Sequence, residues 1–296
     1  MSLTVTQRTG KIWSLYLTSQ RLAWSPAQVD LSHDAADWTR IRREHAREDY
    51  AGQLHRLVGF FHAGEESVCS HLAPLLVAAS RLGLGNDVEC FLTAQLYEEA
   101  KHFEFFERYA HEVLGEDGFV VDRELLAAPR AVLVDDLGTA TARCATETDP
   151  AALRLALVEA ATHYMGIVEA MLARTGYQGA GDALRTRGWL PGLQEGFRLI
   201  RRDEGRHVAF GIQLIRRLLR DDPSLAPAVL ATFERHLPNV LATVQAFDVP
   251  HPIVEVSSLV GYALDAYQLV LAATRRRSRR SSTRPMRSRE SVREQH

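Results

Sequence analysis

The chain has 296 residues, of which 46% are hydrophobic and 24% are charged, a composition typical of a globular protein with a substantial core. We find no unbroken apolar run of the roughly 20 residues that a membrane-spanning helix needs. The first residues lack the basic and apolar regions of a signal peptide, and three cysteines are too few for a disulfide framework. We therefore expect a cytoplasmic protein with reduced thiols.

The net charge of −2 is unevenly distributed along the chain. Residues 275–296 contain nine arginines and two glutamates and carry +7, so the rest of the chain carries −9. A generic nucleic-acid-binding protein would be basic across its folded body, and we expect no nucleic acid for the folded domain. The Arg/Ser-rich composition with almost no apolar residues predicts a disordered tail over residues 274–296. Contact of this tail with nucleic acid or anionic lipid is the alternative.

Residues 1–41 contain Gly10 and Pro26, which predict an N-terminal arm of irregular structure lying against a folded domain. Over residues 42–273, apolar side chains recur at the i, i+3, i+4 and i+7 positions of amphipathic helices. This periodicity predicts an all-α domain with helices long enough for a bundle, and Pro74 should kink the first long helix. Breaks between helices are expected at Gly83–Gly85, Gly115–Gly118, Asp149–Pro150, Gly176–Gly181, Asp221–Pro223 and Asp248–Pro252.

Two Glu-x-x-His sequences stand out in the helical region, Glu99 with His102 and Glu204 with His207. On a helix this spacing places both side chains on one face, where they can bind the same ion. One such pair is weak evidence, because chance alone gives one or two acids three residues before a histidine in a chain of this composition.

The stronger signal is a duplicated frame. Glu65 precedes Glu99 by 34 residues, and Glu169 precedes Glu204 by 35. Each half therefore consists of a helix with one inward glutamate followed by a helix with an inward Glu-x-x-His. The two halves together supply the ligands of a dinuclear metal site in a four-helix bundle, and these ligand types suit iron and manganese. The alternative, acids on solvated helix faces, does not explain why apolar residues flank all four glutamates.

The chain resembles the small subunit of ribonucleotide reductase in five segments, LAWSPAQVDLSHDAADW, GEESV, EEAKH, YMGIVEAMLARTGY and RRDEGRH. It is most similar to the ligand-binding oxidase branch of that group, which houses a mixed manganese–iron centre. The resemblance extends over roughly residues 17–273. It implies a ferritin-like four-helix bundle with additional helices over residues 42–273.

The resemblance also implies roles for the six metal ligands. By this resemblance the first metal is manganese and would be held by Glu65, Glu99 and His102. The second metal is iron and would be held by Glu169, Glu204 and His207. Glu99 would bridge the two ions, and a di-iron cofactor is the alternative.

Two further positions match the oxidase branch, Val68 three residues after the first glutamate ligand and Tyr164 five residues before the third. In that branch, reaction with oxygen joins these two positions by a tyrosine–valine ether cross-link. Members of the branch also bind a long-chain fatty acid in an apolar channel. By resemblance, we expect an O2-dependent dinuclear metal oxidase that binds a long-chain fatty acid or similar apolar ligand. The expected reaction is a two-electron C–H oxidation, and the expected assembly is a homodimer.

Two other functions are left open by the residues. A reductase small subunit shares the fold, but Phe106 occupies the place of its radical-bearing tyrosine, and the tail lacks the tyrosine-bearing peptide that docks on the large subunit. Trp24 and Asp203 match the electron-transfer path of that subunit. We favour a packing role for Trp24 and a hydrogen bond that Asp203 accepts from a ligating histidine. A metal-storage bundle is the less favoured alternative, because the long segment between Glu99 and Glu169 does not suit a minimal storage subunit.

Overall fold

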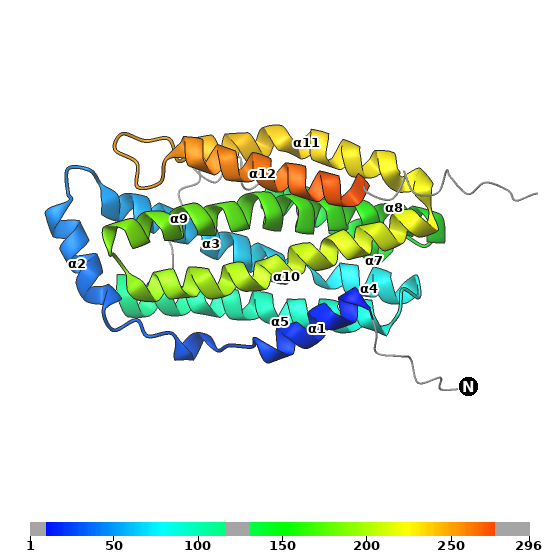
Figure 1. Ribbon diagram of the computed structural model, residues 1–296, viewed down its shortest axis with the longest axis horizontal. Coiled ribbons are helices and arrows are strands. Elements are labelled where there is room, and N and C mark those ends of the chain that lie inside the picture. Colours follow the sequence, from blue (N-terminus) through cyan, green and yellow to red (C-terminus); the bar gives the residue numbers. More distant parts are fainter. Residues whose placement is uncertain (1–9, 116–130, 276–296) are drawn as a thin grey trace, which may run out of the picture.

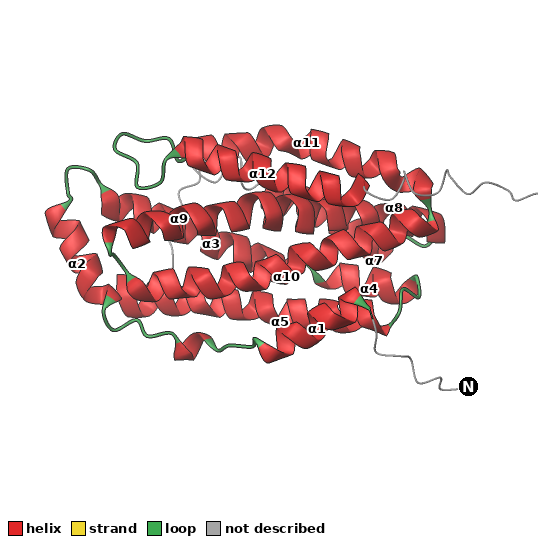
Figure 2. Cartoon of the chain, in the orientation of Figure 1, coloured by secondary structure: helices red, strands yellow, loops and turns green. Residues whose placement is uncertain are grey.

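The computed structural model describes residues 10–115 and 131–275, which fold into helices with no strand among these residues (Figures 1 and 2). The disordered tail predicted over residues 274–296 lies outside the described residues, apart from its first two positions. In chain order the elements are α1 (Lys11–Arg21), η1 (Pro26–Gln28), α2 (Asp34–Glu44), α3 (Tyr50–His71), α4 (Ala73–Arg81), α5 (Asn86–Tyr109), η2 (Ala110–Leu114), η3 (Ala131–Asp136), α7 (Leu137–Thr146), α8 (Pro150–Ala161), η4 (Thr162–Ala173), α9 (Arg174–Arg187), α10 (Pro191–Asp221), η5 (Pro223–Leu225), α11 (Ala226–Gln245) and α12 (Val256–Arg275).

Four long helical segments form the central bundle: α3, α5, α10 and the continuous run of α8, η4 and α9. Within the bundle, α3 packs on α5 and η4 packs on α10. The last two helices, α11 and α12, cover the outer side of η4, and α1 lies along α5 (Figure 1). The predicted all-α bundle with additional helices is confirmed.

The helical run Pro150–Arg187 is long and apolar enough to cross a membrane by length and composition, which the sequence analysis did not anticipate. However, 89% of its most apolar window is buried inside the protein. A helix that is apolar on all sides is expected at the centre of a large bundle. We therefore interpret this run as a core helix.

The prediction of irregular structure for residues 1–41 is wrong for most of the residues of this segment that the structure describes, because they form helices α1 and α2. Trp38 and Ile41 of α2 are buried, and burial of an apolar face stabilises a helix more than local propensity does. The residues that suggested irregular structure lie outside the two helices, with Gly10 before α1 and Pro26 in the short 3-10 turn η1. The predicted boundary between arm and domain falls inside α2, and the division itself stays a prediction.

The break predicted at Gly176–Gly181 is also wrong, because α9 continues through this stretch. A Cβ atom on Gly176 would lie 2.8 Å from the Phe61 ring, and one on Gly179 would lie 2.6 Å from Leu259. These two glycines therefore let side chains of α3 and α12 pack directly against the α9 backbone.

The other breaks are confirmed where the structure describes them. Helices end or begin at Gly83–Gly85, Asp149–Pro150, Asp221–Pro223 and Asp248–Pro252. Pro74 does more than kink a helix: α3 ends at His71, and α4 begins with Pro74 in its first turn, where a missing N–H is tolerated. Gly115 follows η2 with a φ of 71°, and the remainder of the break predicted there lies outside the described residues.

Asp34 of α2 joins the N-terminal helices to the start of α10. Its carboxylate accepts hydrogen bonds from the backbone N–H groups of Gly192 and Leu193, both at 2.8 Å, and from the Tyr109 hydroxyl at 3.1 Å. The first N–H groups of a helix have no partner within the helix. The fully buried Asp34 therefore caps α10 from another element and fixes where this helix begins.

Replacing Asp34 with alanine should lower the free energy of unfolding by about 2–3 kcal/mol, because two helix N–H groups and a buried hydroxyl lose their partner. Chemical denaturation followed by circular dichroism measures the change. Glu44→Ala, at an exposed position of the same helix, is the matched control and should change the free energy little. Equal effects of the two substitutions would contradict the capping role.

His163 of η4 and His236 of α11 form a buried imidazole pair with ring centroids 4.0 Å apart. His163 Nε2 lies 2.9 Å from the carbonyl oxygen of Val132. Burial, and then the neighbouring His236, lowers the pKa of His163 from its ordinary 6.5 to about 3. Burial also lowers the pKa of His236, so the pair is neutral near pH 7.

The stability that the neutral His163 contributes should be lost as the pH falls from 6.5 towards 3. Over this range the unfolded chain binds a proton that the folded chain does not, which costs up to about 1.4 kcal/mol per pH unit. Between pH 7 and pH 5, the free energy of unfolding of the unsubstituted protein should therefore fall by about 2 kcal/mol more than that of His163→Gln. The control His111→Gln, at an exposed position, should show the same pH dependence as the unsubstituted protein. If His163→Gln also showed that same dependence, the neutral His163 would not be the source of it.

Candidate metal centre

The six predicted ligands come from all four segments of the bundle and meet in its interior. Glu65 lies on α3, Glu99 and His102 on α5, Glu169 on η4, and Glu204 and His207 on α10. Each of these side chains belongs to a residue that is at most 4% exposed. The duplicated frame of the sequence therefore corresponds to two helix pairs that face each other.

The ligand atoms fall into two groups, in each of which all the atoms lie within 4.8 Å of one another. The first group comprises Glu65, Glu99, His102 and Glu204, and the second comprises Glu99, Glu169 and His207. The distance from His102 Nδ1 to Glu99 Oε2 is 3.3 Å, and that from His207 Nδ1 to Glu99 Oε1 is 3.1 Å. Because its two oxygens face the two histidines, Glu99 is placed to bridge two ions.

Glu204 differs from the arrangement expected from the sequence, which placed it with the second metal. Its Oε1 atom lies 3.5 Å from His102 Nδ1 in the first group, whereas its Oε2 atom lies 3.9 Å from His207 Nδ1. The carboxylate therefore faces both groups, and its assignment to the second metal stays a prediction.

The residues present fit a pair of metal ions. Four buried atoms that point into the site have no hydrogen-bond partner: Nδ1 of His102, Nδ1 of His207, Oε2 of Glu169 and Oε2 of Glu204. Buried polar atoms without partners are rare in proteins. Carboxylate and imidazole donors without a thiolate are the ligand set expected for manganese and iron.

The electrostatics of the ligands point to the same conclusion. Burial raises the pKa of Glu204 well above its ordinary value and that of Glu169 to about 7. Burial alone would raise the pKa of Glu99 and lower that of His207. The charge of His207 reverses the shift of Glu99, and the charges of Glu169 and then Glu99 reverse that of His207. Protons on the imidazoles thus compensate the buried carboxylates, and divalent cations would take over this role.

Two further acids contact the outward nitrogens of the two predicted histidine ligands, and each acid lies on the opposite helix from the histidine that it contacts. Asp203 on α10 has its Oδ2 atom 3.4 Å from Nε2 of His102 on α5. Glu98 on α5 has its Oε2 atom 2.8 Å from Nε2 of His207 on α10. Each carboxylate accepts from the outward nitrogen and so leaves the inward Nδ1 free to bind a metal. The role expected for Asp203 agrees with this geometry.

Glu98 was missed by the sequence analysis, although a signal was present. The pentapeptides EEAKH and DEGRH share the order acid, glutamate, small residue, cation, histidine. The cations at the fourth position, Lys101 and Arg206, are both buried. Lys101 Nζ lies 3.3 Å from Asp203, and Arg206 Nη2 lies 2.6 Å from Glu98 and from Asp203. The two outer acids therefore have compensating charges of their own.

Trp24 completes this outer network. Its indole Nε1 donates to Asp203 Oδ2 at 2.7 Å, and Lys101 Nζ lies 4.9 Å from the centroid of its ring. The tryptophan is buried, in keeping with the packing role expected for it. It is also connected to the predicted metal ligand His102 through a single carboxylate.

A family model described as "Ribonucleotide reductase, small chain" matches residues 5–237. The chain belongs to this family. The resemblance inferred from its motifs is thereby confirmed.

Solved structures similar to this small-chain family member carry metal cofactors. A variant of an R2-like ligand-binding oxidase with an anaerobically reconstituted Mn/Fe cofactor has a TM-score of 0.81 and 27% sequence identity, and the match covers 91% of this chain and 95% of that chain. A second variant, with a non-activated Mn/Mn cofactor, has a TM-score of 0.81 and 26% identity with the same coverage. A third, with an aerobically reconstituted Mn/Fe cofactor, has a TM-score of 0.80 and 25% identity, again over 91% and 95% of the two chains. The predicted ferritin-like fold is confirmed by these matches.

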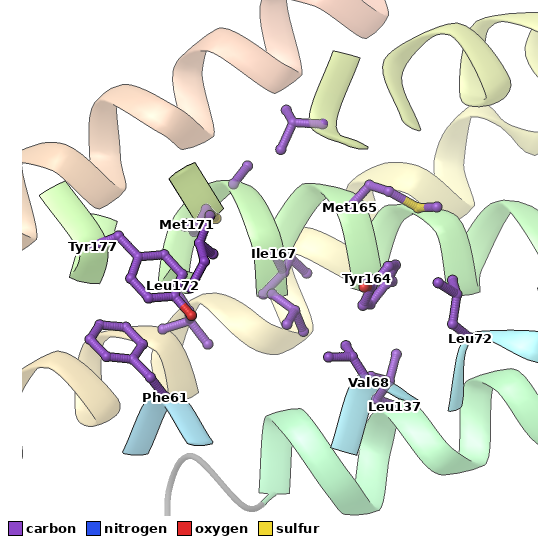
Figure 3. Close-up of a cluster of buried hydrophobic side chains, with 14 of the residues drawn as sticks. Phe61, Val68, Leu72, Leu137, Tyr164, Met165, Ile167, Met171, Leu172 and Tyr177 are labelled. Atoms are coloured by element: carbon purple, nitrogen blue, oxygen red, sulfur yellow. The ribbon is translucent and has the colours of Figure 1, made fainter. Parts of the chain in front are cut away.

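In this small-chain family member an apolar cavity adjoins the ligands. Val68 and Tyr164 both line it, together with Glu65, Glu99, Glu169 and Glu204, and Figure 3 shows the valine below the tyrosine ring. The Tyr164 hydroxyl donates to Glu99 Oε1 at 2.8 Å. The structure thus brings the two predicted cross-link positions to the same cavity, beside the bridging carboxylate.

Two polar contacts at this cavity were not predicted. The Tyr177 hydroxyl donates to Glu65 Oε1, and Gln95 Nε2 donates to Glu169 Oε1 at 2.7 Å. Tyr177 stacks on Phe61 with centroids 4.2 Å apart (Figure 3). Phe106 is fully buried nearby, with its ring centroid 6.3 Å from that of Tyr177. The place of the small-subunit radical tyrosine therefore holds a packed phenylalanine.

Glu98→Gln should weaken metal binding by about 10- to 100-fold at the His207 group, because the neutral amide no longer fixes the imidazole as the carboxylate does. Anaerobic calorimetric titration of the metal-free protein with Fe(II), the metal assigned to this group, measures the affinity. Glu104→Gln, at an exposed position of the same helix, is the matched control. If the two variants bound Fe(II) equally well, Glu98 would have no orienting role.

Proposed function

We propose that this protein is an O2-activating oxidase with a dinuclear Mn/Fe cofactor. Glu65, Glu99 and His102 would hold manganese, and Glu169, Glu204 and His207 would hold iron. The observation that carries the proposal is the position of Tyr164 and Val68, which line one apolar cavity with the ligand carboxylates. The Mn/Fe cofactors of the similar solved structures support the choice of metals.

When bound, the reduced metal pair would supply the oxidising power of O2 to this cavity. Burial, and then the nearby carboxylates, raise the pKa of Tyr164 well above its ordinary value, so the phenol keeps its proton until it reacts. Its hydroxyl already donates to Glu99 Oε1, which gives the proton a direct acceptor. Ether formation removes this hydrogen and one C–H hydrogen of Val68, and O2 is the acceptor of the two electrons.

The same cavity would hold the substrate. Its walls include Phe60, Val168 and Leu172, and apolar walls exclude water and protect an oxidant from other reductants. A long-chain fatty acid with its carboxylate towards the metals fits such a cavity, with two-electron oxidation of a C–H bond as the reaction. By the same family argument we propose a homodimer located in the cytoplasm.

One observation favours a second candidate, a ribonucleotide reductase small subunit. Trp24, Asp203 and His102 form a continuous hydrogen-bonded connection to the site, which is the path that such a subunit uses for electron transfer. Phe106 at the radical position weighs against this function but does not decide, because one manganese–iron class of reductase also carries a phenylalanine there. We rank the oxidase first because Val68 and Tyr164 match the oxidase branch together and line one cavity.

The cross-link is tested by loading the metal-free protein anaerobically with Mn(II) and Fe(II), admitting air and analysing denatured peptides by mass spectrometry. The peptides of Val68 and Tyr164 should be joined with the loss of two hydrogens. Tyr164→Phe should bind both metals and form no cross-link. Tyr177→Phe, which removes the other buried phenol of the cavity, should still form it. Unjoined peptides in a fully metal-loaded protein would favour the reductase subunit.

A further inference from the structure

A second apolar cavity lies beyond the one that adjoins the metal ligands. The two cavities share Phe60, Phe61 and Leu172 as lining residues. The outer cavity continues between α3, α9 and the segment that joins α11 to α12, where Leu57, Phe247 and other side chains line it. The two cavities therefore adjoin at these three side chains.

The roof of the outer cavity is held in place by hydrogen bonds. Ile253 and Val249, in the segment between α11 and α12, line it. Gln53 of α3 donates from Nε2 to the carbonyl oxygen of His251 at 3.2 Å and accepts at Oε1 from the N–H of Ile253 at 2.8 Å. Because one side chain holds the backbone of this segment at two points, the outer cavity is a defined part of the fold.

Arg56 carries the only charge among the described residues that line the outer cavity. Arg56 forms an ion pair with Asp49, at 3.4 Å, and the two side chains are 33% and 63% exposed, respectively. Such exposed pairs contribute little, so an anion from a ligand can replace Asp49. An apolar chain filling the cavity would remove water from the guanidinium and leave it only the exposed Asp49 as a partner, which is less favourable than a second anion beside it.

The spacing along α3 sets the length of the ligand. Arg56 and Glu65 are nine residues apart on this helix, which corresponds to about 13.5 Å along its axis and about two and a half turns around it. The ligand must therefore pass around the side of α3 as well as along it. A ligand that touches both ends therefore needs an extended apolar chain between two polar ends.

We propose that the outer cavity binds the far end of the ligand and that Arg56 binds an anionic group there. The ligand class is then a long-chain acid with a second acidic group at its other end, such as an α,ω-dicarboxylic acid. One carboxylate lies at the metal ligands, the apolar chain passes Phe61, and the second carboxylate pairs with Arg56. This inference rests on the proposed function, since it takes the orientation of the first carboxylate from it.

The test compares dodecanoic acid with dodecanedioic acid as ligands of the Mn/Fe-loaded protein, with dissociation constants measured by calorimetry after removal of bound lipid. Arg56→Gln should weaken binding of the diacid by about tenfold, as expected for the loss of one charge-assisted hydrogen bond, and change that of the monoacid by about twofold at most. Arg56→Lys, which keeps the charge, should retain part of the diacid affinity. Arg217→Gln is the matched control, since Arg217 is about as exposed as Arg56 and also pairs with an aspartate, Asp87.

Each other outcome overturns the proposal in a recognisable way. If the unsubstituted protein binds the monoacid but not the diacid, or if Arg56→Gln leaves both affinities unchanged, the proposal is wrong and the proposed oxidase stands. An equal loss for both acids would place a single carboxylate at Arg56 and reverse the orientation of the ligand. If neither acid binds, the fatty-acid ligand of the proposed function fails as well.

Discussion

Four carboxylates meet in the interior of the bundle, and the structure depends on compensation of the charge that they carry. Glu65, Glu99, Glu169 and Glu204 are each at most 4% exposed, so water does not stabilise their ionised forms. Unpaired buried charges cost several kcal/mol each. Two divalent ions balance four carboxylates when both imidazoles are neutral. This balance explains why the inward Nδ1 atoms of His102 and His207 lack hydrogen-bond partners while their outward nitrogens are engaged.

The duplicated pentapeptide makes the two halves of the site depend on each other. The acid that precedes each glutamate ligand reaches the histidine of the opposite helix, from Glu98 to His207 and from Asp203 to His102. Arg206 pairs with both acids and so joins the two networks. A shift of α5 along α10 by one turn would break both outer hydrogen bonds at once. The register between these helices is thus set by the same residues that orient the ligands.

The sequence predicts which six side chains meet in the bundle, because helical periodicity alone decides which residues share a face. The spacing of Glu99 and His102 is local, and the repeat of the frame gives the second half. The crossed contact from Glu98 to His207 was not predicted, because it depends on which helices face each other across the bundle. The stretch from Gly176 to Gly181 was read as a break, since a sequence does not show whether a glycine serves a turn or the close approach of a neighbour such as Phe61. Helical spacing within the sequence therefore predicts the candidate ligands, whereas the residues that orient them depend on how the helices pack.

The N-terminal helices illustrate how the supporting contacts extend the site beyond the bundle. Asp34 caps the helix that carries Glu204 and His207, and Trp24 donates to the acid that orients His102. Trp24 also covers Lys101, a cation that is 2% exposed. A charge-assisted hydrogen bond is stronger in a low dielectric than in water, so keeping water away from Asp203 strengthens its hold on the imidazole. The described part of the segment predicted as a separate arm thus acts on the predicted metal ligands through burial, without supplying one of the six.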